Sequence, residues 1–517
     1  MPAPIEWAKR LDKALDAKLP YTSLYNAYYD GDHRLQFATE KFRKAFGGLF
    51  DEFADNWCAP VVNALDERLQ VVGFRFGDAE EADRDAWDIW QANHMDAESR
   101  LAIKASLIDA ESFLLVWPDA DGNPEITVES ADQMIVECSP GSRYRRLAAW
   151  KRYRDDWTGE WLGVLYLPDG IYKYRAAAGA VDVTVAEAKA MMGRAWEPRY
   201  VSGEQWPLPN PFEVVPVVPI RNDPRLRYPC RSELASVIPL QDAINKVLAD
   251  AIVASEFGAF RQKWATGIEI PVDPDTNQEI EPFRIAMERF ITAPPSELGE
   301  EPARFGDFNA TDLSNFTGFL DMLVMHVASH TRTPPHYLNA SADRLSGESI
   351  KAAETGLVSK ARERFLHMGE AFEEAMRLCF LIRGDARADF AGAETIWKDP
   401  ESRTEAEHID AVGKKRTLLD VPRRQTWEDA GYSPQTMARM EAMEAAEALE
   451  DDPDRVKVVI DMLDKATPAV AAGVLSVDEL RDLLNRFGAG LTGPAPEPMP
   501  APVPPVTPVP VPPPAGG

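Results

Sequence analysis

Cysteine is scarce in this chain, whose 517 residues include only four. They stand far apart, at Cys58, Cys138, Cys230 and Cys379, and none belongs to a Cys-x-x-Cys pair. A zinc ribbon needs such pairs, and a disulfide framework needs cysteines at closer spacing. We therefore interpret all four as reduced, mostly buried thiols, which excludes the disulfide-rich class of small secreted proteins.

Histidine and the common catalytic motifs are rare as well. Among the seven histidines, only His326, His330 and His336 are spaced closely enough to suggest a metal site. No His-Glu-x-x-His pattern accompanies them, so polar positions along a helix and its end are the favoured interpretation. The chain also lacks a Gly-x-x-x-x-Gly-Lys-Ser/Thr loop and a Gly-x-Ser-x-Gly elbow. We predict no catalytic residue, no metal site and no cofactor, and a nuclease-like pair of carboxylates remains the enzymatic alternative.

Long apolar runs and a positive charge balance are also missing. No run approaches the ~18 apolar residues that a membrane-spanning helix needs, and Met1–Arg10 lacks the basic and apolar segments of a secretory signal. We therefore expect a protein without a membrane partner that stays in the cytoplasm where it is made. The formal charge is −28, from 56 basic and 84 acidic residues, which by itself disfavours a protein that grips nucleic acid.

The sequence does contain apolar material for several cores, since 45% of its residues are hydrophobic. The first 100 residues are expected to be helical, with one helix near Glu80–Met95 that carries Trp87 and Trp90. Between residues 100 and 220, short apolar or alternating runs separated by turn residues predict a mostly antiparallel sheet. The runs are Phe113–Trp117, Glu125–Glu129, Met134–Cys138, Leu147–Trp150, Trp161–Leu167 and Gly170–Tyr174.

Long helices are predicted in the second half of the chain. Apolar residues at helical spacing indicate a helix over Ser232–Lys263 and another over Asp312–Ser329, with an acidic, proline-containing tract between them. Ile350–Cys379 keeps this spacing for about eight turns. Shorter helices are expected at 402–415, 434–450, 454–463 and 476–487, and the proline-rich segment after residue 493 should be extended and disordered.

Four stretches, in a common order, resemble the portal proteins of long-tailed, siphophage-type double-stranded DNA phages of actinobacterial hosts. They are Tyr28-Tyr-Asp-Gly-Asp-His-Arg-Leu; Lys41-Phe-Arg-Lys-Ala-Phe-Gly with Asn56-Trp-Cys-Ala-Pro-Val-Val-Asn-Ala-Leu; Arg304-Phe-Gly-Asp-Phe with Asp312-Leu; and Thr333-Pro-Pro-His-Tyr-Leu with Leu345-Ser-Gly-Glu-Ser-Ile. One such string would be weak, whereas four in register are specific. The resemblance covers residues 20 to 440.

This resemblance implies an α+β, multidomain portal fold. Mapped onto this sequence, it predicts N-terminal helices and a β-rich wing (1–230), a first stem helix (231–263), a clip (264–309), a second stem helix (310–337), a tunnel loop (338–348), a long wing helix (349–394), a helical crown (395–490) and a proline-rich disordered tail (491–517). Two long helices around an insert of different composition agree with a helical hairpin that carries a small domain at its tip.

The resemblance also implies two sets of site residues. The tunnel loop would face DNA, and we hypothesise weak phosphate contacts by its only cation, Arg344, with pairing to Asp343 or Glu348 as the alternative. The DNA-facing set is Asn339, Ser341, Asp343, Arg344 and Ser346. The acidic side chains of the clip would dock partners, with a solvated loop as the alternative. This set is Asp273, Asp275, Glu279, Glu281, Glu297, Glu300 and Glu301.

The implied function is a dodecameric ring at one capsid vertex, which serves as the channel for packaging and ejecting double-stranded DNA. A mainly acidic ring would repel phosphates and let the DNA slide. The expected partners are further copies of the chain, the DNA, the large terminase, the head–tail adaptor, the major capsid protein and a scaffolding protein. The protein would assemble in the host cytoplasm and reside in the virion at the head–tail junction. Another virion structural protein, such as a minor capsid or connector component, remains the main alternative, and a DNA-processing enzyme the weaker one.

Overall fold

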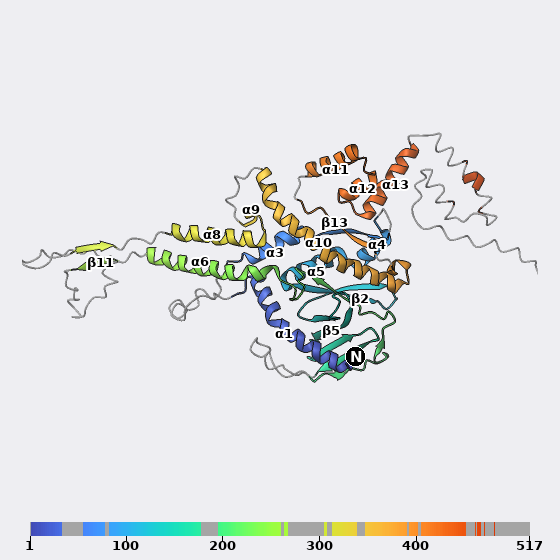
Figure 1. Cartoon of the computed structure of the whole chain (residues 1–517), viewed down its shortest axis with the longest axis horizontal. Coiled ribbons are helices and arrows are strands. Elements are labelled where there is room, and N and C mark those ends of the chain that lie inside the picture. The colour runs from blue at the N-terminus through green and yellow to red at the C-terminus, as the bar shows by residue number, and fades with distance from the viewer. Residues whose placement is uncertain are drawn as a thin grey trace, which may run out of the picture. The chain divides into compact units, whose positions relative to one another are not determined.

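The computed structural model describes residues 2–33, 55–77, 82–176, 195–259, 263–266, 304–307, 313–338, 347–389, 392–401 and 405–450, together with a few positions between 461 and 480. It is a mixed structure of helices and sheets (Figure 1). The chain divides into two compact units, Met1–Val421 with Asp429–Gly431, and Pro422–Glu428 with Tyr432–Gly517. Within the described ranges, no helix has the length and apolar character needed to cross a membrane.

Among the described residues of its N-terminal part, the first unit has four helices and one strand. These are α1 (Pro4–Asp30), α3 (Cys58–Asp66), β1 (Val71–Phe76), α4 (Arg84–Ala92) and α5 (Met95–Asp109). The helix expected over Glu80–Met95 is confirmed as α4, which carries Trp87 and Trp90, but it ends at Ala92 and a second helix begins at Met95. The amide of Asn93 donates to the carbonyl of Ile89 at 2.9 Å, and His94 adopts a left-handed φ of 55°, so the backbone turns between α4 and α5.

Strand β1 corrects the expectation that the first 100 residues are helical. It pairs antiparallel with β13 (Ala393–Trp397), with Phe74 opposite Thr395. Phe74 is fully buried, and its ring centroid lies 5.1 Å from that of Trp90 on α4. Because the partner strand is so distant in sequence, no local pattern marks the pairing. The predicted crown boundary at residue 395 falls inside β13.

The described residues of 111–176 and 195–221 form two antiparallel sheets. The three-stranded sheet has the order β10–β2–β3 and contains β2 (Glu111–Pro118), β3 (Pro124–Glu129) and β10 (Val217–Arg221). The six-stranded sheet contains β4 (Met134–Cys138), β5 (Arg146–Arg154), β6 (Trp161–Tyr166), β7 (Gly170–Ala176), β8 (Glu197–Pro198) and β9 (Leu208–Pro209). Each of the six predicted runs coincides with a strand, and the antiparallel pairing is confirmed.

A buried charge cluster attaches α1 to the six-stranded sheet. Arg152 on β5 donates to Asp12 at 2.6 Å and to Asp16 at 2.7 Å. The indole of Trp196 donates to the other carboxylate oxygen of Asp12 at 3.0 Å. Since the Arg152 side chain is only 3% exposed, these partners satisfy a charge that water cannot reach. The cluster therefore fixes which face of α1 lies on the sheet.

Helix α10 (Gly347–Arg383) supplies one side of the main hydrophobic core. Its predicted apolar stripe is confirmed, because Leu357, Ala361, Met368 and Phe372 are all almost fully buried. The ring of Phe372 meets that of Trp90 at 5.5 Å. The helix ends at Gly384, whose φ of 68° suits glycine, and the 3-10 helix η3 (Ala386–Asp389) follows.

Two antiparallel helices form a hairpin that we define by α6 (Ile238–Ala259), β11 (Lys263–Thr266), β12 (Arg304–Asp307) and α8 (Ser314–Thr331). Figure 1 shows α6 and α8 side by side, with β11 beyond their far end. Lys263 pairs with Asp307 in the β11–β12 register, so the chain leaves α6 and returns to α8 at the same end. The 3-10 helix η1 (Glu233–Ser236) precedes the hairpin and the short α9 (Pro335–Leu338) follows it. The helix expected over Asp312–Ser329 is confirmed as α8, and that over Ser232–Lys263 is confirmed as α6 except at its ends, where η1 precedes it and Lys263 belongs to β11.

The C-terminal third contains α11 (Glu405–Leu419), α12 (Arg423–Asp429) and α13 (Pro434–Glu450). The helix expected over 434–450 is confirmed with the same bounds, and α11 lies close to the one expected over 402–415. In the second unit, Arg424 lies 3.0 Å from Glu441, which joins α12 to α13. The helices expected at 454–463 and 476–487 and the proline-rich tail lie outside the continuously described residues.

Candidate functional site

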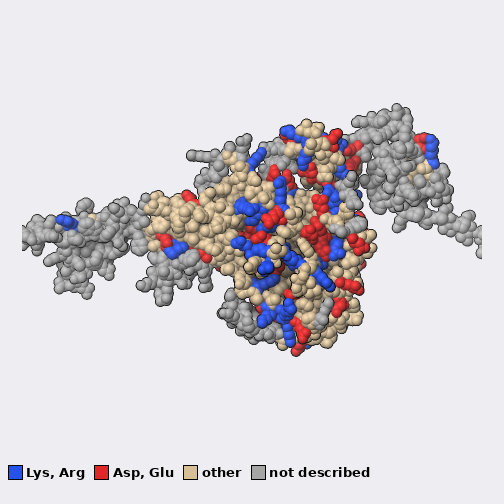
Figure 2. All heavy atoms as spheres, viewed as in Figure 1, with Lys and Arg blue, Asp and Glu red and all other residues tan. Residues whose placement is uncertain are grey.

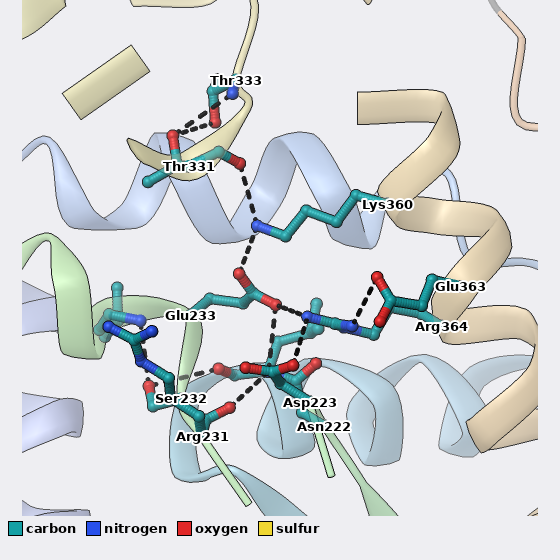
Figure 3. Close-up of polar contacts among 12 residues, drawn as sticks. Asn222, Asp223, Arg231, Ser232, Glu233, Thr331, Thr333, Lys360, Glu363 and Arg364 are labelled. Atoms are coloured by element: carbon teal, nitrogen blue, oxygen red, sulfur yellow. Dashed lines mark hydrogen bonds and ion pairs between the residues drawn. The ribbon is translucent and has the colours of Figure 1, made fainter. Parts of the chain in front are cut away.

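A buried cluster of charges holds the base of the hairpin on α10 (Figure 3). Glu233, in η1, lies between Lys360 and Arg364, which project from successive turns of α10. Arg364 Nη2 is 2.9 Å from Glu233 Oε1, and the ammonium group of Lys360 contacts Oε2. The side chains of Glu233, Lys360 and Arg364 are 6%, 11% and 5% exposed. This charge triad is therefore almost completely removed from water.

Lys360 connects both ends of the hairpin. Besides its contact with Glu233, it donates to the backbone carbonyl of Thr331 at 3.0 Å. Thr331 is the last residue of α8, where helix carbonyls lack partners and the helix dipole is negative. One cation on α10 thus contacts the segment that enters α6 and the residue that ends α8, as Figure 3 shows.

Uncharged groups complete the cluster. The amide of Asn222 donates to the carbonyl of Arg231 at 2.8 Å and to Glu233 Oε1 at 3.1 Å. The hydroxyl of Ser232 accepts the backbone N–H of Leu234 at 3.1 Å and so caps η1. These bonds fix the path of the backbone into α6, which places Glu233 between its two cations.

The pKa of Glu233 shows how the triad works electrostatically. Burial raises the pKa of this carboxyl, but the charges and hydrogen bonds of Lys360 and Arg364 outweigh burial and bring it below its ordinary value. Glu233 therefore stays ionised at neutral pH. The triad is a fixed structural contact, and removing one member would leave an uncompensated buried charge.

A second buried contact lies beside α9 and the first turns of α10. Arg68, at the end of α3, donates to the Tyr337 hydroxyl at 2.8 Å, to Glu354 Oε1 at 3.2 Å and to the carbonyl of Pro400. The Arg68 and Glu354 side chains are 7% and 8% exposed. This contact anchors the chain on both sides of residues 339–346.

A third polar contact fixes the start of α6 on α1. The Tyr28 hydroxyl donates to Asp242 at 2.5 Å. Asn245 contacts His33 at 2.8 Å, and the His33 ring stacks on Tyr28 with centroids 4.2 Å apart. Burial lowers the pKa of His33, although the nearby Asp242 charge raises it. The N-terminal end of α6 is thus held by α1 as well as by α10.

The two faces of α8 differ in exposure. Leu323 and Val327 are buried in the main core, and Leu320 packs against it. On the other side, Phe319, Met322 and Met325 are 46%, 45% and 49% exposed. On the face seen in Figure 2, the described part of the hairpin carries few charged side chains. The hairpin therefore presents an apolar stripe with no described cover.

The twelve residues predicted for the tunnel loop and the clip lie outside the described residues. This applies to Asn339, Ser341, Asp343, Arg344 and Ser346, and to Asp273, Asp275, Glu279, Glu281, Glu297, Glu300 and Glu301. The structure describes the flanks of both segments. Leu338 ends α9 and Gly347 begins α10, while β11 and β12 bracket residues 267–303.

The three closely spaced histidines and the four cysteines can be placed in the structure. The rings of His326 and His330 lie 6.4 Å apart on the exposed side of α8, and His336 Nε2 lies 3.7 Å from Glu354. Within the described ranges, no three His, Cys, Asp or Glu side chains gather into a metal-holding group. The four cysteines are thiols, and burial raises the pKa of Cys58 and Cys379 to about 12.

The sequence reasoning did not identify Glu233, Lys360 or Arg364. One signal was available, because Arg364 follows Ala361 by three positions and Leu357 by seven and so shares their buried face. A charge on such a face requires a buried counter-charge. Its partner lies in η1, far away in the sequence, and could not be named from spacing.

This chain matches a family model, curated sequences and solved structures. The family model "Phage portal protein, SPP1 Gp6-like" matches residues 8–450. The portal protein of Mycobacterium phage D29 is 32% identical over 411 residues, 75% of this chain and 79% of that protein. The portal protein of Mycobacterium phage L5 is 32% identical over 407 residues, 75% of this chain and 78% of that protein. A chain of the neck of a native gene transfer agent (GTA) particle, computed with C12 symmetry, is 13% identical over 70% of this chain and 90% of its own length, with a TM-score of 0.37.

The family match spans both helices of the hairpin, the helix α10 that holds them and the two sheets. The two curated relatives are matched over more than two thirds of their length. The chain therefore belongs to the SPP1 Gp6-like family of phage portal proteins.

Proposed function

We propose that this portal protein forms a dodecameric ring at one capsid vertex and that double-stranded DNA is packaged and ejected through the ring. The observation that supports assembly is the uncovered apolar stripe of α8. Phe319, Met322 and Met325 are each close to half exposed. Single exposed apolar side chains are ordinary, but an aligned group of them is typical of an interaction surface.

A ring of identical subunits would cover this stripe. In a cyclic assembly, one face of each subunit meets a different face of the next. Helices α6 and α8 of neighbouring copies would then form a continuous wall, and the contacts of Lys360 with both ends of the hairpin would hold each hairpin at a fixed angle to its wing. The hairpin helices are accordingly the proposed stem, at 231–263 and 310–337.

The remaining parts of the proposed portal architecture follow from this placement. The wing comprises 1–230 with the helix at 349–394, the clip 264–309, the tunnel loop 338–348, the crown 395–490 and the proline-rich tail 491–517. The β11–β12 pair supports a clip that begins and ends at the tip of the hairpin. The Arg68–Glu354 contact supports a loop with rigid ends between α9 and α10.

We propose that the tunnel loop touches passing DNA weakly, with Arg344 as its cation and Asn339, Ser341, Asp343 and Ser346 as its polar neighbours. An anchored loop is suited to this task, because its ends cannot follow the moving DNA. Replacing Arg344 with alanine is expected to alter the amount or rate of DNA packaged. Unchanged packaging would remove this role.

The proposed clip would dock the large terminase and then the head–tail adaptor through the acidic set Asp273, Asp275, Glu279, Glu281, Glu297, Glu300 and Glu301. Further proposed partners are the major capsid protein and a scaffolding protein. The role is structural rather than enzymatic, and assembly takes place in the host cytoplasm before the protein becomes part of the virion at the head–tail junction.

Native mass spectrometry of purified protein tests the assembly. The wild type is expected to form a closed oligomer, whereas the double variant Phe319→Asp/Met322→Asp should remain folded and fail to assemble. Thr317→Asp is the matched control, since Thr317 is exposed on the same helix but lies on the side away from Phe319 and Met322. Assembly of the double variant at wild-type concentrations would contradict the proposal.

A further inference from the structure

Arginine is concentrated on two loops near the base of the hairpin. Residues 139–146 and 221–231 together contain seven arginines and one acidic residue, in a chain with 56 basic and 84 acidic residues. Arg231 directly precedes the Ser232–Glu233 segment that enters the hairpin (Figure 3). Figure 2 shows Lys and Arg side chains gathering on the body next to the hairpin. This part of the surface is therefore basic in an acidic protein.

Exposed aromatic and aliphatic side chains accompany these arginines. Leu226, Tyr144 and Tyr228 are 92%, 70% and 68% exposed, and Tyr21 and Leu24 on α1 are 63% and 42% exposed. We define the arginine–tyrosine surface as Tyr21, Leu24, Arg143, Tyr144, Arg145, Arg225, Leu226, Arg227, Tyr228 and Arg231. Tyrosine and arginine are the residue types enriched in protein-binding hot spots.

Three interactions connect α1 and the two loops that carry these residues. Burial and the neighbouring Tyr21 raise the pKa of the Tyr25 phenol on α1, and the charges of Arg231 and Arg225 act on it in the opposite direction. The Arg225 guanidinium lies 5.3 Å from the Tyr228 ring centroid. Arg221 donates to the carbonyl of Arg143 at 3.2 Å, which ties the two loops together.

A pocket of about 80 Å³ opens between these loops and α10. Arg143, Tyr144, Arg221 and Pro224 line it on the loop side. The Nη2 atom of Arg143 is buried there and has no hydrogen-bond partner among the described residues. An unpaired buried donor is costly, and more so when it is charged.

Two carboxylates of α10, Glu370 and Glu374, line this pocket, and that of Glu374 is already engaged. Glu374 of α10 accepts hydrogen bonds from Arg146 at 2.5 Å and from Arg377 at 2.7 Å. Burial raises the pKa of Glu374, but its bonds to these arginines outweigh burial and lower it. Since Glu370 is an acceptor within the pocket, the exposed arginines of the two loops are the groups that a carboxylate of another molecule can reach.

We propose that the arginine–tyrosine surface binds the next copy of this chain in the ring, with carboxylates of that copy pairing with its exposed arginines. The inference rests on the proposed ring. Two observations select a second copy as the occupant. A chain of net charge −28 offers many carboxylates to a basic surface, and this surface adjoins the base of the hairpin whose apolar stripe is assigned to the same neighbour. Leu226, at 92% exposure, offers a protein partner an apolar contact that a DNA backbone would not use.

Site-specific photo-cross-linking tests the contact in the assembled full-length protein. A benzoylphenylalanine at position 226 is expected to give cross-linked multimers of the chain after irradiation. Trp157, 98% exposed on the turn between β5 and β6, is the matched control position and should give none. Cross-links from position 226 to the capsid protein or to DNA, in place of another copy, would overturn the inference.

Charge reversal provides a second measurement. Arg227→Glu and Leu226→Asp change exposed side chains, so both variants should fold with unchanged circular dichroism and melting temperature. Each is expected to raise the protein concentration needed for half-assembly about tenfold, and Arg227→Glu should also flatten its salt dependence. Arg84→Glu, at an exposed arginine of α4, should leave assembly unchanged.

The outcomes separate this inference from the proposed function. A wild-type chain that forms rings, with Arg227→Glu and Leu226→Asp assembling equally well, overturns the contact and leaves the ring in place. A wild-type chain that forms no ring at any concentration contradicts both.

Discussion

Neutralising Glu233 should release the base of the hairpin while leaving the wing folded. The substitution Glu233→Gln keeps the shape of the side chain and the bond from Asn222, but leaves Lys360 and Arg364 without their shared counter-charge. Asp223 and Glu363 are poor substitutes, because they lie 3.9 Å and 3.6 Å from Arg364. Breaking a buried ion pair on one side costs about 3–5 kcal/mol.

Hydrogen exchange measured by mass spectrometry is the assay. If the cost falls on local opening, about 3 kcal/mol corresponds to roughly a hundredfold faster amide exchange. We expect this acceleration in peptides from residues 233–245 and from the end of α8, and none in strands β5 and β6. Asp410→Asn, which breaks the exposed Lys414–Asp410 pair (both side chains 63% exposed), is the control and should change little.

The triple substitution Glu233→Met/Lys360→Met/Arg364→Met is a second test of whether the charge triad holds the hairpin. It removes all three charges together, and apolar replacement of a buried ionic cluster is often neutral. Much of the lost protection should therefore return. Wild-type exchange in Glu233→Gln, or a triple variant no better protected than the single one, would show that the triad does not hold the hairpin.

Three further predictions concern the body of the protein. The pKa of Glu233 is lower in the folded state than its ordinary value. Protection of residues 233–245 from hydrogen exchange should therefore be full above the ordinary carboxyl pKa and decline as the pH falls through the lower folded value. Hydrogen exchange measured across acidic pH, corrected for intrinsic exchange rates, tests this. Burial, together with Asp132, raises the pKa of Asp109 to about 7, although a hydrogen bond from Asn26 opposes the shift. The wild type should therefore lose stability as the pH rises toward 7. Asp109→Asn should have a higher melting temperature than the wild type at pH 8, and the difference should be smaller at pH 5. Gly163→Ala would place a Cβ 2.2 Å from Trp150, and we expect a lower melting temperature with altered near-ultraviolet circular dichroism, whereas Gly413→Ala, with open space around it, should be tolerated; an unchanged melting temperature for Gly163→Ala would contradict the packing described for the six-stranded sheet.

The sequence predicted those elements whose signal is local. The strands from β2 to β7 alternate or are continuously apolar and are separated by turn residues, so each was located without knowledge of its partner. Helix α10 was predicted for the same reason, because its stripe repeats every three or four residues. The resemblance to portal proteins rested on short strings in a fixed order, and the family match supports it.

The missed features depend on contacts between distant residues. Strand β1 was predicted as helix because its partner, β13, lies at the other end of the first unit. The α4–α5 break depends on Asn93, which bonds the carbonyl of Pro124 at 3.1 Å as well as that of Ile89. The charge triad brings η1 together with two successive turns of α10, and no spacing rule connects Glu233 with Lys360.

Electron microscopy of the purified full-length protein, viewed down the symmetry axis of its particles, tests the central claim most directly. The account predicts a closed ring with twelvefold symmetry, walls formed by the α6–α8 hairpins, and an axial channel wide enough for duplex DNA. A compact particle without an axial channel would contradict the account.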